Sequence, residues 1–256
     1  MAIGPTDERR HDADLAVDND TGAGGWNEVW DLDFVTTDGA LAATFSMLLN
    51  ATTGRAGYAL SLVGPTQDLV TLADFDMAGP KPPGLEVRAP GLWSEFICQV
   101  PFDHFTVDVE AFAVQLDDPE AVFEGAYGVR VAVGCELEWE TDGPVVPMFG
   151  SPGWEGYAVP CRVTGEWLLD DAVIEIEGWG WRRHRWGQID TLSAAVTPGA
   201  ATTTWWRGRT TAGEWVQGGV SAELRAGTII ATAPRPDGVR HNLMQMPSGL
   251  LWVDVG

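Results

Sequence analysis

The sequence predicts an almost wholly β protein in which antiparallel strands form barrels or sandwiches. Apolar and polar side chains alternate in WNEVWDLDF (26–34) and in VRVAVGCELEWE (129–140), as in strands with one buried face. Short segments rich in glycine, proline and polar residues separate such runs. Few windows have the period of a long helix. Many short strands at this spacing are typical of β-barrels and β-sandwiches.

The N-terminal half begins with a polar segment and continues as a series of strands. Residues 1–24 are rich in aspartate and end in TGAGG, which predicts a flexible tail. In the strand that follows, alternation places Glu28 on the apolar face, between Trp26 and Trp30. Further strands are expected near 41–49, 57–63, 69–75, 93–100 and 104–115.

A boundary between two halves is expected where proline and glycine interrupt the strand pattern, between TDGP (141–144) and GSPGWEG (150–156). Beyond it, two strands are expected to meet at Asp170 and Asp171 as a hairpin. Later strands are expected at 202–208, 214–224, 228–232, 240–246 and 250–255. The predicted domains are an N-terminal β-barrel domain at 25–145, a linker at 146–156 and a C-terminal β-barrel domain at 157–256.

The charge of the chain excludes several classes of partner. The 256 residues include 15 basic and 37 acidic side chains, a formal net charge of −22. Such a chain repels phosphate backbones and anionic lipid, so neither nucleic acid nor a membrane surface is an expected partner. No apolar run is long enough for a membrane span, and the opening MAIGPTDERR lacks the apolar core of a secretion signal. We therefore expect a cytoplasmic protein.

The sequence predicts neither a metal site nor a cofactor. None of the four histidines, His11, His104, His184 and His241, is paired at ligand spacing. The three cysteines lie singly in apolar runs. Phosphate-binding loops, dinucleotide fingerprints and the Gly-x-Ser-x-Gly nucleophile motif are also lacking.

The segment GWGWRRHRWG (178–187) combines arginine and tryptophan in one strand. Alternation would put Arg182, His184 and Trp186 on one face, and Trp181, Arg183 and Arg185 on the other. The glycines of the segment suit places where another group approaches closely. A basic cluster results, which also takes in Arg207 and Arg209 and which could pair with acidic side chains or bind an anionic group.

In three sequence features, the chain resembles the AttH-like superfamily of double lipocalin-like proteins. This superfamily includes carotenoid 1,2-hydratases and fungal decalin-forming Diels–Alderases. The features are an opening Asn27-Glu28 strand, a second-domain entry of the form GYAVPCRVTGEW (156–167), and the segment 178–187. The last is similar to a Gly-x-Gly-x-Arg-Asp-His-x-Trp-Gly signature.

The resemblance implies two lipocalin-like antiparallel β-barrel domains packed together, and a hydrophobic small molecule, often an isoprenoid or polyketide, held by them. Arg182, His184 and Trp186 match the signature and are carried over as site candidates. The aspartate of the signature falls on Arg183 in this chain. A mechanism that depends on that aspartate therefore cannot be transferred, and an acid must be sought elsewhere.

Adding or removing water at an alkene needs a proton donor in a water-poor pocket that tolerates a carbocation. Glu28 is the candidate acid, because burial among apolar side chains would keep it protonated near neutral pH. His184 is a candidate proton relay. Trp30, Trp181 and Trp186 would line the substrate pocket, where indole faces attract cations. Each residue also has a structural interpretation: a carboxylate satisfied by hydrogen bonds, a core histidine, and aromatic side chains that fill a core.

The leading functional hypothesis is a cofactor-independent hydratase or dehydratase, a lyase that acts on a hydrophobic isoprenoid or terpenoid, for example a tertiary monoterpenol such as linalool. Two alternatives come from other classes. One is a non-catalytic carrier of lipid or terpenoid, and the other is a pericyclase of a polyene. The sequence leaves open whether the chain forms a homo-oligomer.

Overall fold

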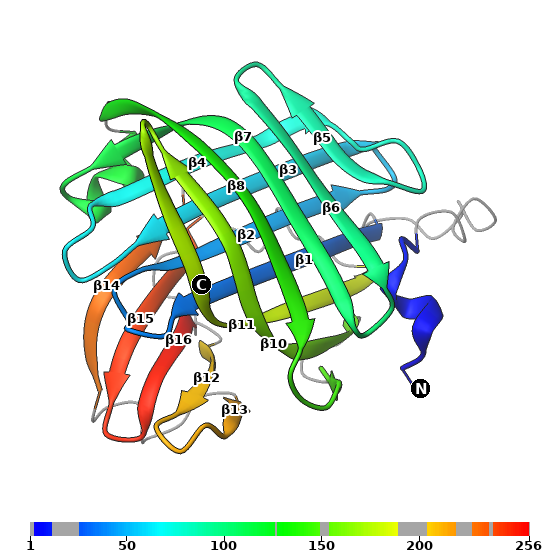
Figure 1. Cartoon of the computed structure of the whole chain (residues 1–256). Coiled ribbons are helices and arrows are strands. Elements are labelled where there is room, and N and C mark those ends of the chain that lie inside the picture. Colours follow the sequence, from blue (N-terminus) through cyan, green and yellow to red (C-terminus); the bar gives the residue numbers. More distant parts are fainter. Residues whose placement is uncertain are drawn as a thin grey trace.

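The computed structural model describes residues 3–11, 26–125, 127–148, 154–188, 204–218, 227–235 and 238–255. Most of them belong to antiparallel strands (Figure 1). Two short 3-10 helices accompany the strands, η1 (Pro5–Glu8) and η3 (Pro119–Glu124). The predicted all-β fold class, with antiparallel strands, is confirmed. In the described part of the chain, no helix has the length and apolar character to cross a membrane.

The larger of two sheets has eleven strands and closes on itself. One path through it runs β4 (Leu69–Ala78), β3 (Arg55–Val63), β2 (Ala42–Asn50), β1 (Trp26–Thr36), β11 (Ala172–Gln188), β10 (Trp154–Leu169), β8 (Val129–Thr141), β7 (His104–Leu116), β6 (Leu92–Val100) and β5 (Leu85–Ala89). The short β9 (Val146–Pro147) pairs with β10. Strand β4 also pairs with β7, with Leu69 opposite Leu116, and this pairing closes the sheet into a barrel.

Strands β10 and β11 lie between β1 and β8, although they follow the predicted linker in the sequence. They form the expected hairpin, with Asp170 at the turn in the left-handed region, at a φ of 50°. The segment 178–187 is the second half of β11. The larger sheet therefore extends past the predicted linker at 146–156.

The smaller sheet is built from the remaining strands and packs beside the larger one (Figure 1, orange and red). Its order is β13 (Trp215–Gly218), β12 (Thr204–Thr210), β16 (Gly249–Val255), β15 (Arg240–Met246) and β14 (Thr228–Pro234). Trp252 and Leu243 of this sheet share a buried cluster with Val35 of β1 and with Trp179 and Trp181 of β11. The smaller sheet thus covers the outer face of the β1–β11 pair.

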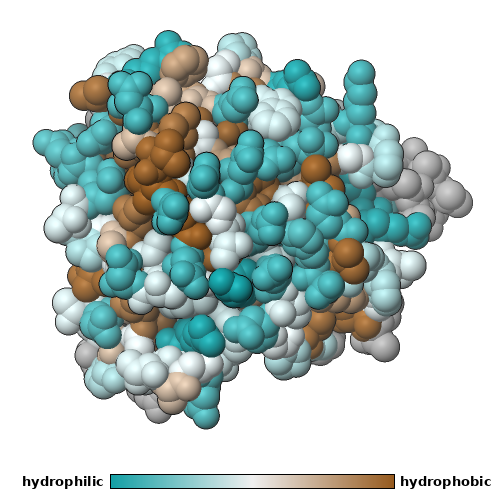
Figure 2. Space-filling view, in the orientation of Figure 1, coloured by the Kyte–Doolittle hydropathy of each residue, from teal (hydrophilic) through white to brown (hydrophobic). Residues whose placement is uncertain are grey.

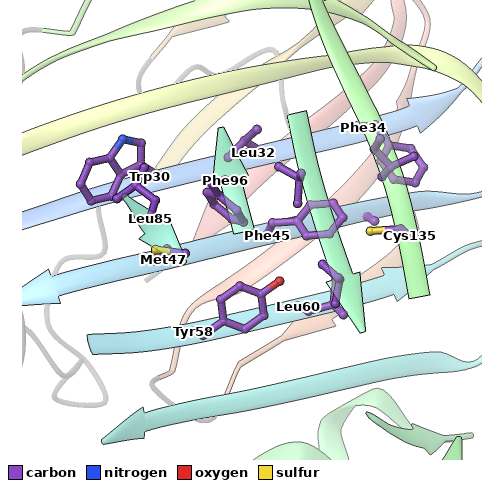
Figure 3. Close-up of a cluster of buried hydrophobic side chains, with 14 of the residues drawn as sticks. Trp30, Leu32, Phe34, Phe45, Met47, Tyr58, Leu60, Leu85, Phe96 and Cys135 are labelled. Carbon is purple, nitrogen blue, oxygen red and sulfur yellow. The ribbon is translucent and has the colours of Figure 1, made fainter. Parts of the chain in front are cut away.

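The inner face of the barrel carries the main hydrophobic core. Figure 3 shows side chains from six strands, β1, β2, β3, β5, β6 and β8, gathered inside it. Trp30, Leu32 and Phe34 of β1 point inward, while Asp31 and Asp33 between them point outward, as alternation predicts. Each large apolar side chain buried in this way contributes about 1.5–3 kcal/mol to stability.

The outward side chains of β1 and β11 form an ion network with the smaller sheet. Asp33 pairs with Arg207 of β12, and Arg207 in turn donates to Asp254 of β16. Arg183 donates to the same Asp254 oxygen at 3.0 Å and lies 4.0 Å from Asp31. These groups are almost fully buried, and the network therefore ties the two sheets together by charge as well as by apolar contact.

The guanidinium groups of the network lower the pKa of two of its three buried carboxyls, Asp31 and Asp254. Burial alone would raise the pKa of Asp31, but the Arg185 and Arg183 guanidinium groups hold it well below its ordinary value. Burial likewise opposes ionisation of Asp254, and Arg207 with His241 and Arg183 keeps its pKa far below the usual range. At these two carboxyls the neighbouring positive charge outweighs burial, whereas at Asp33 burial outweighs the charge of Arg207 and raises the pKa.

Two glycines of β11 let it approach β1 closely. A Cβ atom at Gly180 would lie 1.8 Å from the carbonyl oxygen of Asp33, and one at Gly178 would lie 2.2 Å from that of Val35. At Gly134 of β8, in the same sheet, the nearest atom to such a Cβ is a Leu168 side-chain carbon at 3.4 Å. Only glycine therefore fits at the two β11 positions, whereas a residue with a Cβ atom would also fit at Gly134.

The face of the molecule in Figure 2 is mostly hydrophilic, with one apolar band across its upper left part. Leu168 and Val173, which pair across the β10–β11 hairpin, are among the exposed large apolar side chains. The abundant acidic residues account for the hydrophilic surroundings.

Gly180→Ala is expected to destabilise the protein by on the order of 1–3 kcal/mol, because the added methyl group forces the two paired strands apart. Gly134→Ala is the control and should change the free energy of unfolding much less. Urea unfolding followed by tryptophan fluorescence measures both. Equal losses in the two variants would show that the close approach of β11 to β1 is not a constraint.

Asp254→Asn is expected to destabilise the protein at pH 7 by roughly 3–5 kcal/mol, because it leaves buried guanidinium charge uncompensated. A carboxyl whose folded pKa is lowered contributes stability above its unfolded pKa of about 3.9 and loses it as the pH falls below that value. The difference in melting temperature between wild type and variant should therefore narrow from pH 7 to pH 3. Asp76→Asn is the control, since Asp76 pairs with Arg55 at the surface, where a pair contributes about 0–1 kcal/mol. A difference that stays constant with pH would contradict the assignment.

Candidate functional site

Glu28 and His184 meet inside the barrel, near the start of β1. The register pairs Trp30 with His184 and Glu28 with Trp186, so the glutamate and the histidine are diagonal neighbours on one face. His184 Nε2 lies 2.9 Å from Glu28 Oε1. The glutamate side chain is 0% exposed and the histidine side chain 1% exposed. Two strands that are far apart in the sequence thus supply a buried acid–imidazole pair.

The hydrogen bonds of this pair determine where protons lie. His184 Nδ1 is 2.9 Å from the backbone carbonyl oxygen of Asp7. A carbonyl oxygen only accepts hydrogen bonds, so Nδ1 carries a proton and donates it. The contact between Nε2 and Glu28 Oε1 then holds one proton, either as a carboxylic acid beside a neutral imidazole or as a carboxylate beside an imidazolium. The pair is therefore a buried, hydrogen-bonded acid–imidazole contact.

The N-terminal segment, residues 3–11, closes this end of the barrel and contacts both members of the pair (Figure 1, dark blue). The backbone N–H of His11 donates to Glu28 Oε1 at 2.8 Å. Arg10 is buried and donates to the carbonyl oxygens of Pro80 and Gly84, in the connection between β4 and β5. The sequence pattern assigns this segment to a flexible tail, whereas in the structure these contacts hold it against the barrel.

Aromatic rings surround the acid–imidazole pair. The Trp30 ring stacks on His184 with a centroid separation of 4.5 Å, and the Trp186 ring stacks on His11 at 4.1 Å. The Tyr157 hydroxyl is 3.4 Å from His184 Nδ1. Burial raises the pKa of Tyr157 well above its ordinary value, and the charge of Glu8 adds to this effect, so the phenol stays neutral. The proton donor therefore lies in an aromatic, water-poor setting.

A second buried pair lies beside the first. Both Glu8 carboxylate oxygens contact Arg182 Nη1, the longer contact being 2.6 Å. The guanidinium lies 5.4 Å from the centre of the Phe105 ring. Burial alone would lower the pKa of Arg182, but the Glu8 carboxylate raises it above its ordinary value. Arg182 is thus a permanent cation whose partner comes from the N-terminal segment.

Three side chains of the site have the geometry to hold a metal ion. One ligand atom each from His11, Glu28 and His184 lies within 4.8 Å of the other two. His11 Nε2 and Glu28 Oε2 are buried and have no hydrogen-bond partner. Burial lowers the pKa of His11, and the charge of His184 lowers it further, so the imidazole is neutral. Sequence spacing could not show this group, because its members are far apart in the chain.

The structure brings together five of the six residues that sequence analysis selected. Glu28, Trp30, Arg182, His184 and Trp186 all lie on the inner face of the β1–β11 pair. The sixth, Trp181, is on the outer face, where its ring contacts Trp215 of the smaller sheet. It cannot line the same pocket, because neighbouring residues of a strand point to opposite faces.

Sequence reasoning missed the N-terminal contributors Asp7, Glu8 and His11. They lie in a polar segment without periodicity, and their partners are up to 177 positions away. The only available signal was the presence of a histidine and several acidic residues in the tail.

The chain matches one protein family over most of its length. Residues 4–247 match the family described as a domain of unknown function, DUF7064. The chain belongs to this family. No curated protein sequence matches this DUF7064 chain.

Several solved structures are similar to the DUF7064 chain over most of its length. The crystal structure of CghA with Sch210972 is 11% identical with a TM-score of 0.44, and the match covers 86% of this chain and 54% of CghA. Kievitone hydratase from Nectria haematococca is 12% identical with a TM-score of 0.46, at 90% and 64% coverage. An AttH-like protein from Nitrosomonas europaea is 10% identical with a TM-score of 0.46, at 96% coverage of both chains. The chain thus spans about half to two thirds of the length of CghA and kievitone hydratase.

Glu8→Gln is expected to release the N-terminal segment, because it removes the charge that balances buried Arg182. Amide hydrogen exchange measured by mass spectrometry should become faster over residues 3–11 and stay slow in β1. Glu110→Gln, at an exposed position of β7, is the control. Unchanged protection of residues 3–11 in Glu8→Gln would show that the ion pair does not hold the segment.

Proposed function

We propose that this protein is a hydratase or dehydratase that adds or removes water at a tertiary centre of a hydrophobic isoprenoid, with the Glu28–His184 pair as the proton donor. The observation that carries the proposal is the 2.9 Å contact between Glu28 Oε1 and His184 Nε2 in a buried, aromatic setting. Such a group is what acid-assisted loss of a hydroxyl requires. The resemblance of the segment 178–187 to hydratase-type sequences supports the same reaction class.

In the dehydration direction, Glu28 gives a proton to the substrate hydroxyl, and the C–O bond breaks to release water. The tertiary carbocation then loses a proton from a neighbouring carbon to form the alkene, and this proton restores Glu28. His184 relays the proton, and its Nδ1–H donation to the Asp7 carbonyl holds the ring in place. The proton comes from the Oε1 side of the carboxyl group, and the buried Oε2, which has no hydrogen-bond partner, is the atom available to take up the proton that the carbocation releases.

The surroundings of the pair suit a cationic intermediate. Trp30 and Trp186 lie against the imidazole rings of the site, and an indole face stabilises a nearby cation by about 0.5–2 kcal/mol. Exclusion of water protects the cation from premature capture. Because residues 3–11 cover this end of the barrel, the substrate would enter as that segment moves away.

Glu28→Gln is expected to reduce turnover by about 100-fold or more, since general acid catalysis contributes roughly 10²–10⁴-fold. The assay incubates purified protein with linalool and detects the alkene by gas chromatography. The exposed Glu110→Gln variant serves as the control and should keep wild-type turnover.

Three results would contradict the proposal in different ways. Linalool that quenches tryptophan fluorescence but is recovered unchanged would favour a carrier. Full turnover in Glu28→Gln would remove the glutamate from the mechanism. Cyclisation of a polyene that is insensitive to Glu28→Gln would favour a pericyclase, where the shape of the pocket matters more than one carboxyl group.

A further inference from the structure

We propose that His11, Glu28 and His184 form a binding site for a divalent first-row transition metal ion. Two imidazole nitrogens and one carboxylate oxygen are the donor set of many catalytic zinc sites and of non-haem iron(II) sites. The ligand atoms of the three residues lie within 4.8 Å of one another. This inference does not rest on the proposed lyase reaction, because it concerns only the binding of the ion.

Two of the ligand atoms are unexplained without a further partner. His11 Nε2 and Glu28 Oε2 are buried and lack a hydrogen bond, although buried polar atoms are normally paired. The Glu28 side chain is fully buried, so water cannot readily satisfy it from outside. A cation between these two atoms would satisfy both.

The third ligand is already oriented for coordination. His184 Nδ1 donates to the Asp7 carbonyl oxygen at 2.9 Å, which leaves Nε2 directed toward Glu28. A ligating histidine usually donates its other ring N–H to a carbonyl or carboxylate in this way, which fixes the tautomer and the ring orientation. Trp30, stacked on His184, restricts the ring further.

Of the three ligands, His11 is the one that can move to adjust its distance to the ion. Atoms around a tetrahedral zinc ion lie roughly 3.4 Å apart, given bonds of about 2.0–2.1 Å. His184 Nε2 already lies 2.9 Å from Oε1 of the same Glu28 carboxylate, so the imidazole and the carboxylate are adjacent before an ion binds. Wider separations can close through His11, which belongs to the N-terminal segment outside the sheets and is only half-buried.

Occupation of this site would exclude the acid function of the pair. A bound ion takes the place of the proton between Glu28 and His184, since both ligand atoms must be deprotonated to coordinate. Metal-loaded protein is therefore expected to be inactive in the proposed dehydration, and the net charge of −22 raises the local concentration of cations.

Equilibrium dialysis against Zn²⁺, in excess Mg²⁺ to suppress binding to the acidic surface, tests the site. Wild type is expected to bind one Zn²⁺ per chain, and Co²⁺ in its place should give the visible absorption of a four-coordinate ion. His11→Ala should weaken binding by at least about tenfold while the barrel stays folded, as checked by circular dichroism. His104→Ala is the matched control, because His104 lies beside exposed Glu138, away from the three ligands.

Wild type that binds no Zn²⁺, or a His11→Ala variant that binds as tightly as His104→Ala, would overturn the metal site. Because dialysis involves no substrate, such a failure leaves the lyase proposal unaffected. Conversely, Zn²⁺ binding that depends on His11, together with no turnover of linalool by the metal-free protein, would support the metal site and overturn the lyase proposal.

Discussion

The antiparallel pairing of β1 with β11 is the constraint on which the rest of the structure depends. It sets Trp30 opposite His184 and Asp31 opposite Arg183, and so decides which side chains of both strands face the barrel interior. Side chains alternate along a strand, and a slip of one residue would exchange the two faces. If β11 slipped, Arg183 and Arg185 would face the interior, and His184 would leave Glu28 and face the smaller sheet. Close packing at Gly178 and Gly180 favours the observed register.

The two faces of this strand pair have different tasks. Outside, Asp31 and Asp33 meet Arg183, Arg185 and Arg207 in a network that anchors the smaller sheet. Inside, Arg182 pairs with Glu8, and Glu28 contacts the His184 ring and the backbone N–H of His11. Arg183 stands where the resemblance would place an aspartate, and its position on the outer face shows a structural role. In the proposed reaction the acid is therefore sought on the inner face, where Glu28 lies.

Much of this arrangement could be predicted from the sequence, and one part could not. Alternation assigned Glu28 and Trp30 to one face of their strand and separated His184 from Arg183, because a period of two is a local property. Partners are not local. Glu8 meets Arg182 across 174 positions, and no pattern in a polar segment shows such a contact. The insertion of β10 and β11 between β1 and β8 was hidden for the same reason.

The central claim is that Glu28 and His184 share one proton while His184 donates a second proton to Asp7. The most direct measurement is NMR of the protein with ¹⁵N-labelled histidine, which reports the protonation of each ring nitrogen. The account predicts a protonated Nδ1 at His184, and at Nε2 a hydrogen-bonded environment that changes in Glu28→Gln while Nδ1 stays protonated. An unprotonated Nδ1, or an Nε2 signal unaffected by Glu28→Gln, would contradict it.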